Sequence, residues 1–303
     1  MNTFDFSSRI KTGAPKAAPR IVLIGVEGVG KTTAGAQCEA PIFLCAESGL
    51  VGQGFDNLQN FTPETWEDAL DFLRYLASAD HPHKSLVVDT IDWLEPKLFS
   101  FVCNRDKKGS IEEYGYGKGY IIATDEFRKF LFELDRIHKR GILIMINAHC
   151  HIKSFNNPIG DNFDRYELKV CKQIAGLVKE WSDAVLFAKY DVLAVKENSK
   201  GKAKGVGGQK RIVQTQYCAA WDAKNRYGLP VTMPFDMPDI LASMVKGEPD
   251  SAENIIEDIN TLIPKLPADK QAASTAYVTA NKSNVIKLSQ LLNKIRIITE
   301  EAA

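Results

Sequence analysis

One short glycine-rich stretch constrains the fold of this 303-residue chain more than any other feature. Residues 25–32 read Gly-Val-Glu-Gly-Val-Gly-Lys-Thr, after the apolar run 21–24 and before the helix-prone segment 33–37. This is the pattern G-x-x-x-x-G-K-[ST] in a strand, loop and helix context. Glycines let several backbone N–H groups converge on one anion, and the N-terminus of the next helix adds positive potential. The sequence therefore predicts a loop that binds the phosphates of a nucleoside triphosphate.

The loop residues have specific expected places around ATP and Mg²⁺, the two cofactors that the motif predicts. Lys31 is expected to reach the β- and γ-phosphates, and the Thr32 hydroxyl to bind Mg²⁺. The alternative, a glycine-rich turn with an exposed lysine, is disfavoured by the strand before it and the helix after it. The expected nucleotide-binding residues are Gly25, Val26, Glu27, Gly28, Val29, Gly30, Lys31, Thr32 and Thr33.

Composition narrows the class of protein. The chain has 38 basic and 38 acidic residues, so a polyanionic partner would have to meet a local patch of charge. No run reaches the length of a membrane span, and the first 20 residues lack the apolar core of a signal peptide. We therefore expect a soluble, cytoplasmic protein with no membrane partner. The 6 cysteines are scattered without a C-x-x-C pair, which disfavours a disulfide framework or a zinc ribbon.

Buried-strand patterns alternate with amphipathic helices along residues 19–246. Helical spacing of apolar residues predicts helices at 65–79 and 124–139, and the Gly/Lys-rich segment 196–210 predicts a hairpin tip or a mobile loop. Apolar runs predict further strands at 42–46, 85–90, 141–147, 184–188 and 211–217. Such alternation indicates an α/β fold with a mainly parallel sheet between helices.

Two terminal regions are expected to lie outside this core. Residues 1–18 are polar, without periodicity, and are expected to form a flexible arm, or else to dock on a neighbouring subunit through Phe4 and Phe6. The segment 247–250 marks a boundary, and apolar residues at helical spacing follow it. Residues 249–303 are therefore predicted to form a small helical appendage.

Acidic residues at the expected carboxyl ends of two strands extend the predicted site. Asp89 is expected to hold a water of the Mg²⁺ shell, or alternatively to cap the next turn. Glu47 is expected to polarise the water that attacks the γ-phosphate; its alternative is a cap or a solvent-facing side chain. Asp92 is expected at the surface.

The predicted strand ending at Asn147 and His149 should reach the same edge of the sheet. A polar side chain there can sense the γ-phosphate and pass its presence to the next loop. His149 and His151 would share one face of a strand, which is the basis of a zinc alternative, but no third ligand is evident.

The order of these parts resembles the RecA-type ATPase core. A Walker A loop is followed by a strand ending in Glu47, a Walker B strand ending in Asp89 and a sensor strand with Asn147. Residues 222–230, Asp-Ala-Lys-Asn-Arg-Tyr-Gly-Leu-Pro, resemble the Lys-Asn-Lys segment of bacterial RecA. Over residues 19–243 the chain resembles phage-encoded nucleotide-binding proteins with a RecA-like core, some of which are single-strand annealing proteins or minimal recombinases.

This resemblance implies roles for individual residues. Glu47 would activate water, Lys31 would bind phosphate, and His149 would sense the γ-phosphate. Lys224 and Arg226 would reach across a subunit interface to the neighbour's γ-phosphate, where a cationic finger accelerates phosphoryl transfer by roughly 10³–10⁵-fold. ATP sites would then be completed between subunits of a ring or filament.

The resemblance also implies that two loops, at about 104–120 and 150–168, bind single-stranded DNA. Cations can follow the phosphates, and aromatic rings can stack on bases. Judged from its residues alone, the first loop is more readily explained by packing at an interface than by DNA binding, because aromatic loops also pack at interfaces. The expected contacts are Arg105, Lys107, Lys108, Tyr116, Lys118, Lys153 and Arg165.

The predicted function is a DNA-stimulated ATPase that acts on single-stranded DNA in phage-type homologous recombination or annealing. Its expected partners are single-stranded DNA, further copies of itself and a single-strand DNA-binding protein, in the cytoplasm of a bacterial host. Three alternatives remain open from the sequence: a replicative helicase or helicase loader, a nucleotide-dependent scaffold that does not hydrolyse, and a metabolic kinase.

Overall fold

The computed structural model describes residues 17–47, 50, 54–195, 204–246 and 252–283, together with residues 287, 288, 291, 292, 295 and 299. The arm predicted at 1–18 lies outside the described residues except for its last two positions. The hairpin tip predicted within 196–210 lies outside them as far as residue 203.

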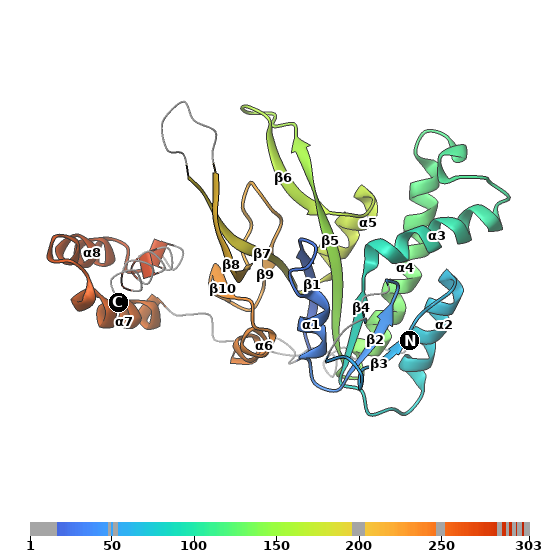
Figure 1. Ribbon diagram of the computed structural model, residues 1–303, viewed down its shortest axis with the longest axis horizontal. Helices are drawn as coiled ribbons and strands as arrows, with labels where there is room; N and C mark the ends of the chain where they lie inside the picture. The colour runs from blue at the N-terminus through green and yellow to red at the C-terminus, as the bar shows by residue number, and fades with distance from the viewer. Residues whose placement is uncertain are drawn as a thin grey trace, which may run out of the picture.

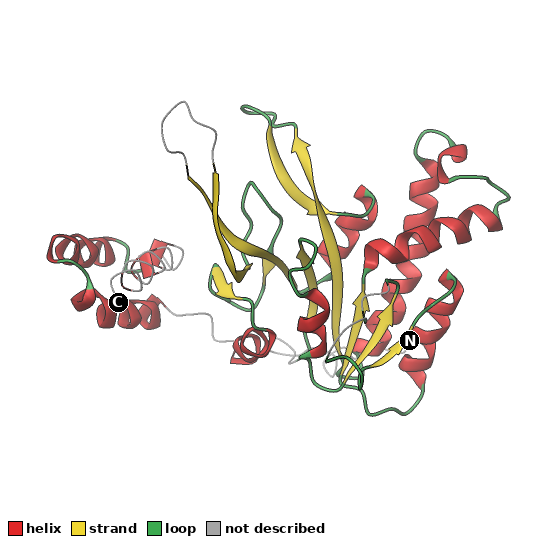
Figure 2. Ribbon diagram, viewed as in Figure 1, coloured by secondary structure: helices red, strands yellow, loops and turns green. Residues whose placement is uncertain are grey.

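A 10-stranded sheet forms the centre of the protein (Figures 1 and 2). Its main path runs in the order β10-β8-β7-β1-β5-β4-β2-β3, with β6 paired to β5 and β9 paired to β7. The strands are β1 (Arg20–Gly25), β2 (Pro41–Cys45), β3 (Gln59–Phe61), β4 (Ser85–Asp89), β5 (Leu143–Phe155), β6 (Phe163–Leu168), β7 (Ala184–Val195), β8 (Lys204–Gln214), β9 (Lys224–Asn225) and β10 (Thr232–Pro234). Pairing is parallel from β3 to β7 and antiparallel elsewhere. The prediction of an α/β fold with a mainly parallel sheet is confirmed.

The strand order places three predicted site segments next to one another. β1 leads into the glycine-rich loop, β4 ends at Asp89, and β5 lies between them, parallel to both. Because the carboxyl ends of parallel strands meet at one edge, the segments that follow these strands gather there. This is the arrangement of a RecA-like P-loop fold.

Helices cover both faces of the sheet because successive residues of each buried strand point to opposite faces. Val22, Ile24 and their neighbours pack against α2 (Trp66–Ser78), α3 (Ile91–Arg105), α4 (Lys118–His138) and α5 (Lys172–Trp181). Ile21 and Leu23 pack against α1 (Lys31–Ala36) and α6 (Met237–Lys246) on the other face. The core therefore has two layers, one on each side of the sheet.

The region 150–168, predicted to be a loop, is mostly a β-hairpin. β5 does not end near His149 but continues to Phe155 and pairs antiparallel with β6 from Cys150↔Leu168 to Phe155↔Phe163. Figure 1 shows this hairpin projecting above the sheet. Several side chains there, such as Ile152 and Lys153, are exposed. A ribbon that leaves the helical layers has no continuous apolar run, so its sequence resembles a loop.

The C-terminal helices have a hydrophobic cluster of their own. α7 (Ala252–Leu262), a 3-10 turn (Ile263–Lys265) and α8 (Ala268–Ala280) enclose Ile255, Ile259, Leu266 and Val278, with Leu288, Leu292 and Ile295. The third predicted helix falls partly outside the described residues, and its described positions 287, 288, 291, 292, 295 and 299 are helical. None of the helices that the structure describes is long and apolar enough to cross a membrane.

Candidate nucleotide-binding site

The phosphate loop connects the end of β1 to the first residue of α1. Gly28 and Gly30 have φ angles of 72° and 103°, in the left-handed region that L side chains rarely adopt. At Gly25, an added Cβ would lie 2.9 Å from the carbonyl oxygen of Ala188, so the close approach of β7 also requires glycine. The glycine spacing that defines the motif is therefore a backbone requirement of this turn.

Lys31 folds back over its own loop. Its Nζ donates hydrogen bonds to the carbonyl oxygens of Gly25, at 3.2 Å, and Val26, at 3.1 Å. Burial lowers the pKa of Lys31, and the nearby carboxylates of Asp89 and Asp92 oppose that shift. The ammonium group is thus held at the mouth of the loop on two weak acceptors. Phosphate oxygens, which carry more negative charge, can replace them.

Thr32, Asp89 and Asn147 converge from α1, β4 and β5. The Thr32 hydroxyl donates to Oδ2 of Asp89 at 2.7 Å, and Nδ2 of Asn147 donates to Oδ1 of the same carboxylate at 2.9 Å. Oδ1 of Asn147 is buried and has no partner within the described part of the chain. Oxygen ligands of this kind suit Mg²⁺, which keeps several of its waters. These residues fit the ion: Thr32 would bind it directly, and Asp89 would hold it through a water.

His149 and Asp92 form a second polar group at the same edge. One oxygen of Asp92 accepts the backbone N–H of His149 at 2.9 Å, and the other lies 2.8 Å from the ring Nδ1. Burial raises the pKa of Asp92, but the hydrogen bonds from His149 outweigh it and hold this pKa below its ordinary value. The carboxylate therefore orients the imidazole and leaves Nε2 as the nitrogen available to a ligand.

The prediction that Asp92 lies at the surface is wrong, since its side chain is only 4% exposed. α3 begins at Ile91, immediately after β4, so the first turn of this helix faces the end of β5. The signal in the sequence was an acidic residue three positions after Asp89, at the start of a helix. It can be interpreted only once β4 and β5 are known to be neighbours.

Glu47 lies beside this group, at the end of β2. Its Oε2 accepts a long hydrogen bond of 3.4 Å from the Thr90 hydroxyl and lies 4.0 Å from Nδ1 of His149. The side chain is 32% exposed and can therefore reach solvent. A carboxylate at the strand edge with access to water has the chemistry of a general base or of a group that orients water.

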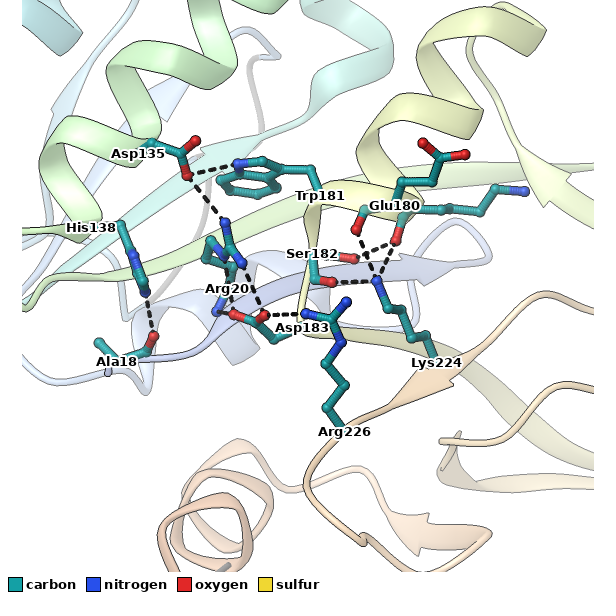
Figure 3. Close-up of polar contacts among 11 residues, drawn as sticks. Ala18, Arg20, Asp135, His138, Glu180, Trp181, Ser182, Asp183, Lys224 and Arg226 are labelled. Atoms are coloured by element: carbon teal, nitrogen blue, oxygen red, sulfur yellow. Dashed lines mark hydrogen bonds and ion pairs between the residues drawn. The ribbon is translucent and has the colours of Figure 1, made fainter. Parts of the chain in front are cut away.

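Lys224 is engaged within its own chain (Figure 3). Its Nζ donates to the last carbonyl groups around the end of α5, those of Lys179 at 3.0 Å, Glu180 at 2.9 Å and Ser182 at 2.6 Å. Burial lowers its pKa. A lysine at a helix C-terminus is stabilised by the helix dipole. To act as a finger in a neighbouring site, Lys224 would have to give up these contacts.

Arg226 has a weaker hold on its own chain. Its Nη1 lies 3.0 Å from Oδ1 of Asp183, and its side chain is 56% exposed. Asp183 is already paired with Arg20, whose Nη1 also bonds Asp135 (Figure 3). This cluster lies at the amino ends of β1 and β7, whereas the phosphate loop follows the carboxyl end of β1. Neither Lys224 nor Arg226 therefore belongs to the candidate nucleotide site of its own chain.

The first region predicted to contact DNA lies between α3 and α4. Tyr116 is fully exposed at 103%, and Lys107, Lys108 and Lys118 are exposed too. Lys108 lies over the ring of Tyr114 at 5.9 Å. Arg105 is less free, because it pairs with Asp106 at 2.8 Å and with the buried Glu126 at 3.5 Å.

The two cations predicted in the second region have different environments. Lys153 is exposed on β5 and lies 3.8 Å from Glu167. Arg165 is buried: its Nη2 is 2.5 Å from Asp222, and its guanidinium lies 5.5 Å from the ring centres of both Phe155 and Tyr217. In this position Arg165 holds β6 to the segment before β9, and only Lys153 is free to meet a phosphate.

Comparison with known proteins assigns the family. Residues 17–227 match the family model described as AAA domain. No curated protein matches the sequence. Among solved structures, the RadB recombinase aligns with a TM-score of 0.37 and 14% sequence identity, over 65% of this chain and 81% of that chain. The family match spans well over half of the chain, and the loop, Thr32 and Asp89 lie within it. The chain belongs to the AAA domain family and is a nucleotide-binding P-loop ATPase with a RecA-like fold.

Proposed function

We propose that this protein hydrolyses ATP in a homo-oligomeric ring or filament and acts on single-stranded DNA in phage-type recombination or annealing. The observation that supports it most is the path of β5. This strand carries Asn147 and His149 at the nucleotide site and, a few residues later, the exposed Ile152 and Lys153 of the hairpin. One strand thereby connects the residues expected at the phosphates to the projecting hairpin.

In this proposal each residue of the site has one task in hydrolysis. Lys31 and the loop N–H groups bind the phosphates, and Thr32 and Asp89 hold Mg²⁺, which neutralises charge that develops on the phosphate oxygens. Glu47 orients the attacking water. His149, held by Asp92, contacts the γ-phosphate and transmits its presence along β5.

The nucleic acid is proposed to lie along the projecting edge of the sheet. Lys153 of the hairpin and the cations Lys107, Lys108 and Lys118 would follow the phosphates, and Tyr116 would stack on a base. A contact of the hairpin with DNA would shift β5, and thereby the position of Asn147 and His149. Binding of DNA would then raise the rate of hydrolysis.

A head-to-tail assembly is proposed because the two halves of the site lie at opposite ends of β1. The phosphate loop follows its carboxyl end, and Arg226 lies at its amino end, on Asp183. A heterologous contact between copies joins two different surfaces and generates rings or filaments. Arg226 is the better placed of the two expected fingers, because its one exposed ion pair is easily exchanged.

The test is the rate of ATP hydrolysis with and without single-stranded DNA, at low and at high salt. We expect stimulation by DNA that disappears at high salt, because phosphate contacts release counterions. Equal rates with and without DNA at low salt would contradict the proposal. Processive unwinding of a tailed duplex would indicate a helicase instead. Negligible hydrolysis by both the wild type and Glu47→Gln would indicate a scaffold.

A further inference from the structure

Two side chains from the β7–β8 hairpin hold the phosphate loop from outside. The Tyr190 hydroxyl donates to the carbonyl oxygen of Gly28 at 2.9 Å, and Nη1 of Arg211 donates to that of Val29 at 3.2 Å. Tyr190 and Arg211 are direct cross-strand partners in the antiparallel register of β7 and β8. They therefore act on consecutive peptide groups of the loop as one pair.

The consequence for phosphate binding follows from the planarity of the peptide. In a trans peptide the C=O and the next N–H point in opposite directions. When Arg211 holds the carbonyl of Val29 away from the site, the N–H of Gly30 is directed into it. Tyr190 fixes the preceding peptide, between Gly28 and Val29, whose N–H donates to the carbonyl oxygen of Val26 at 3.4 Å and closes the turn. Anion binding by such a loop requires its N–H groups to converge.

The loop needs this support because of its glycines. Glycine loses more conformational freedom on ordering than any other residue, and the loop has three of them within residues 25–30. Ordering a loop before the ligand arrives improves affinity, since the cost is no longer taken from the binding energy. The hydrogen bonds of Lys31 to the carbonyl oxygens of Gly25 and Val26 differ from those of Tyr190 and Arg211, because phosphate oxygens can replace them.

The approach of Arg211 is close. A Cβ added at Gly30 would lie only 2.6 Å from Nη1 of Arg211, so the guanidinium packs directly on the turn that precedes α1. Its permanent positive charge therefore lies beside the phosphate-binding peptide groups, within the same subunit. Arg211 thus adds electrostatic attraction for a triphosphate to its hydrogen bond.

The register of β7 and β8 is irregular next to both of these side chains. Tyr190 pairs with Arg211 and Val192 pairs with Gly207, so one residue of β7, Asp191, lies opposite residues 208–210 of β8. At the end of this irregularity Gly207 has a φ of 97°, and an added Cβ would lie 2.6 Å from the carbonyl oxygen of Asp191. Bulges commonly re-aim a side chain beside an active site. Here the irregularity directly follows Tyr190 on β7 and directly precedes Arg211 on β8.

We propose that Tyr190 and Arg211 are positioning residues of the nucleotide site, which hold the phosphate loop in its anion-binding conformation. This inference rests on nucleotide binding, which family membership establishes, and is independent of any action on DNA. Its test uses the full-length protein without nucleic acid.

The measurements are the Kd of a fluorescent ATP analogue and the KM and kcat of basal hydrolysis. Tyr190→Phe removes one hydroxyl and is expected to weaken binding by roughly three- to tenfold. Arg211→Gln also removes a charge and is expected to weaken it by about ten- to a hundredfold. We expect KM to rise with Kd while kcat stays near the wild-type value, because neither side chain acts on the reacting atoms.

Matched controls come from the same region. Lys210→Gln removes an exposed charge next to Arg211 on β8, and Tyr217→Phe removes a hydroxyl from an exposed tyrosine. Both are expected to keep the wild-type Kd. Wild-type affinity in folded Tyr190→Phe would overturn the inference, even if Arg211→Gln failed to fold. If the two variants bind ATP more weakly but DNA does not stimulate hydrolysis by the wild type, this inference is supported and the proposed function is overturned.

Discussion

The Thr32 hydroxyl donates a 2.7 Å hydrogen bond to Oδ2 of Asp89, although the two residues are 57 positions apart in the chain. Asn147 occupies the other oxygen of the same carboxylate. Both oxygens are thus oriented by side chains of two different elements. We predict that this carboxylate holds a metal-bound water, so the loss of its charge should alter the use of Mg²⁺.

Asp89→Asn should raise the Mg²⁺ concentration that gives half-maximal hydrolysis by roughly 10–100-fold, the usual effect of removing a residue that supports a metal ligand. The measurement is a Mg²⁺ titration at saturating ATP. Asp71→Asn, on the exposed face of α2 beside Arg74, is the control and should leave the titration unchanged. An unaltered Mg²⁺ requirement in Asp89→Asn would show that Asp89 is not part of the metal site.

Asp92→Asn should lower kcat by roughly 10–100-fold without changing ATP affinity, because the histidine loses the carboxylate that orients its ring. His149→Gln should have a similar effect. If the two residues act as a pair, the double variant should be no slower than the slower single one. Multiplied losses in the double variant would mean that Asp92 acts by another route.

The same aspartate should contribute to stability in a pH-dependent way. Burial raises the pKa of Asp92, yet hydrogen bonds from His149 bring it below its ordinary value overall. A carboxyl group with a depressed pKa in the folded state stabilises the fold above its unfolded pKa, about 3.9, and this stability is lost as pH falls through the folded pKa. Urea unfolding below about pH 4 should therefore depend less steeply on pH in Asp92→Asn. Identical slopes would contradict the assignment.

Substitution of the two finger candidates should separate a structural role from a role between subunits. Lys224→Met should destabilise the fold by about 1–3 kcal/mol, because carbonyl groups at the end of α5 lose their donor. Arg226→Ala removes one exposed ion pair and should cost at most about 1 kcal/mol, yet it should abolish stimulated hydrolysis. When the Arg226→Ala variant is mixed with an equal amount of the Lys31→Ala variant, about one quarter of the head-to-tail interfaces should combine an intact Lys31 with an intact Arg226, and these interfaces should regain activity. An inactive mixture that still assembles would exclude a finger in trans.

Tyr116→Ala should weaken the binding of single-stranded DNA by about 1–3 kcal/mol, the usual loss for one base stacked on an aromatic ring. Because the ring is fully exposed, the thermal midpoint should not change. Fluorescence anisotropy with a labelled oligonucleotide measures the affinity. Tyr75→Ala, also an exposed tyrosine and located on α2, is the control. Equal affinities of the two variants would remove Tyr116 from the proposed DNA surface.

The nucleotide loop and the parallel sheet could be predicted because their signals are local. Gly28 and Gly30 are required by their φ angles, and the apolar runs of β1 and β4 are required by helices on both faces of the sheet. The length of β5 could not be predicted. Beyond His149 it forms a solvated ribbon, and solvated strands lack the apolar pattern that marks a buried one.

Short-range sterics and strand patterns are enough to specify the loop, its lysine and threonine, and the carboxylate that ends β4, so these features can be identified in the sequence. By contrast, three contacts became evident only from the folded chain: Asp92 with His149, Lys224 with the end of α5, and Arg211 with the loop. A charged side chain looks the same in the sequence whether its partner is a phosphate, a helix end or a distant carboxylate. The partner depends on which strands are neighbours and in what register, and long-range packing sets both.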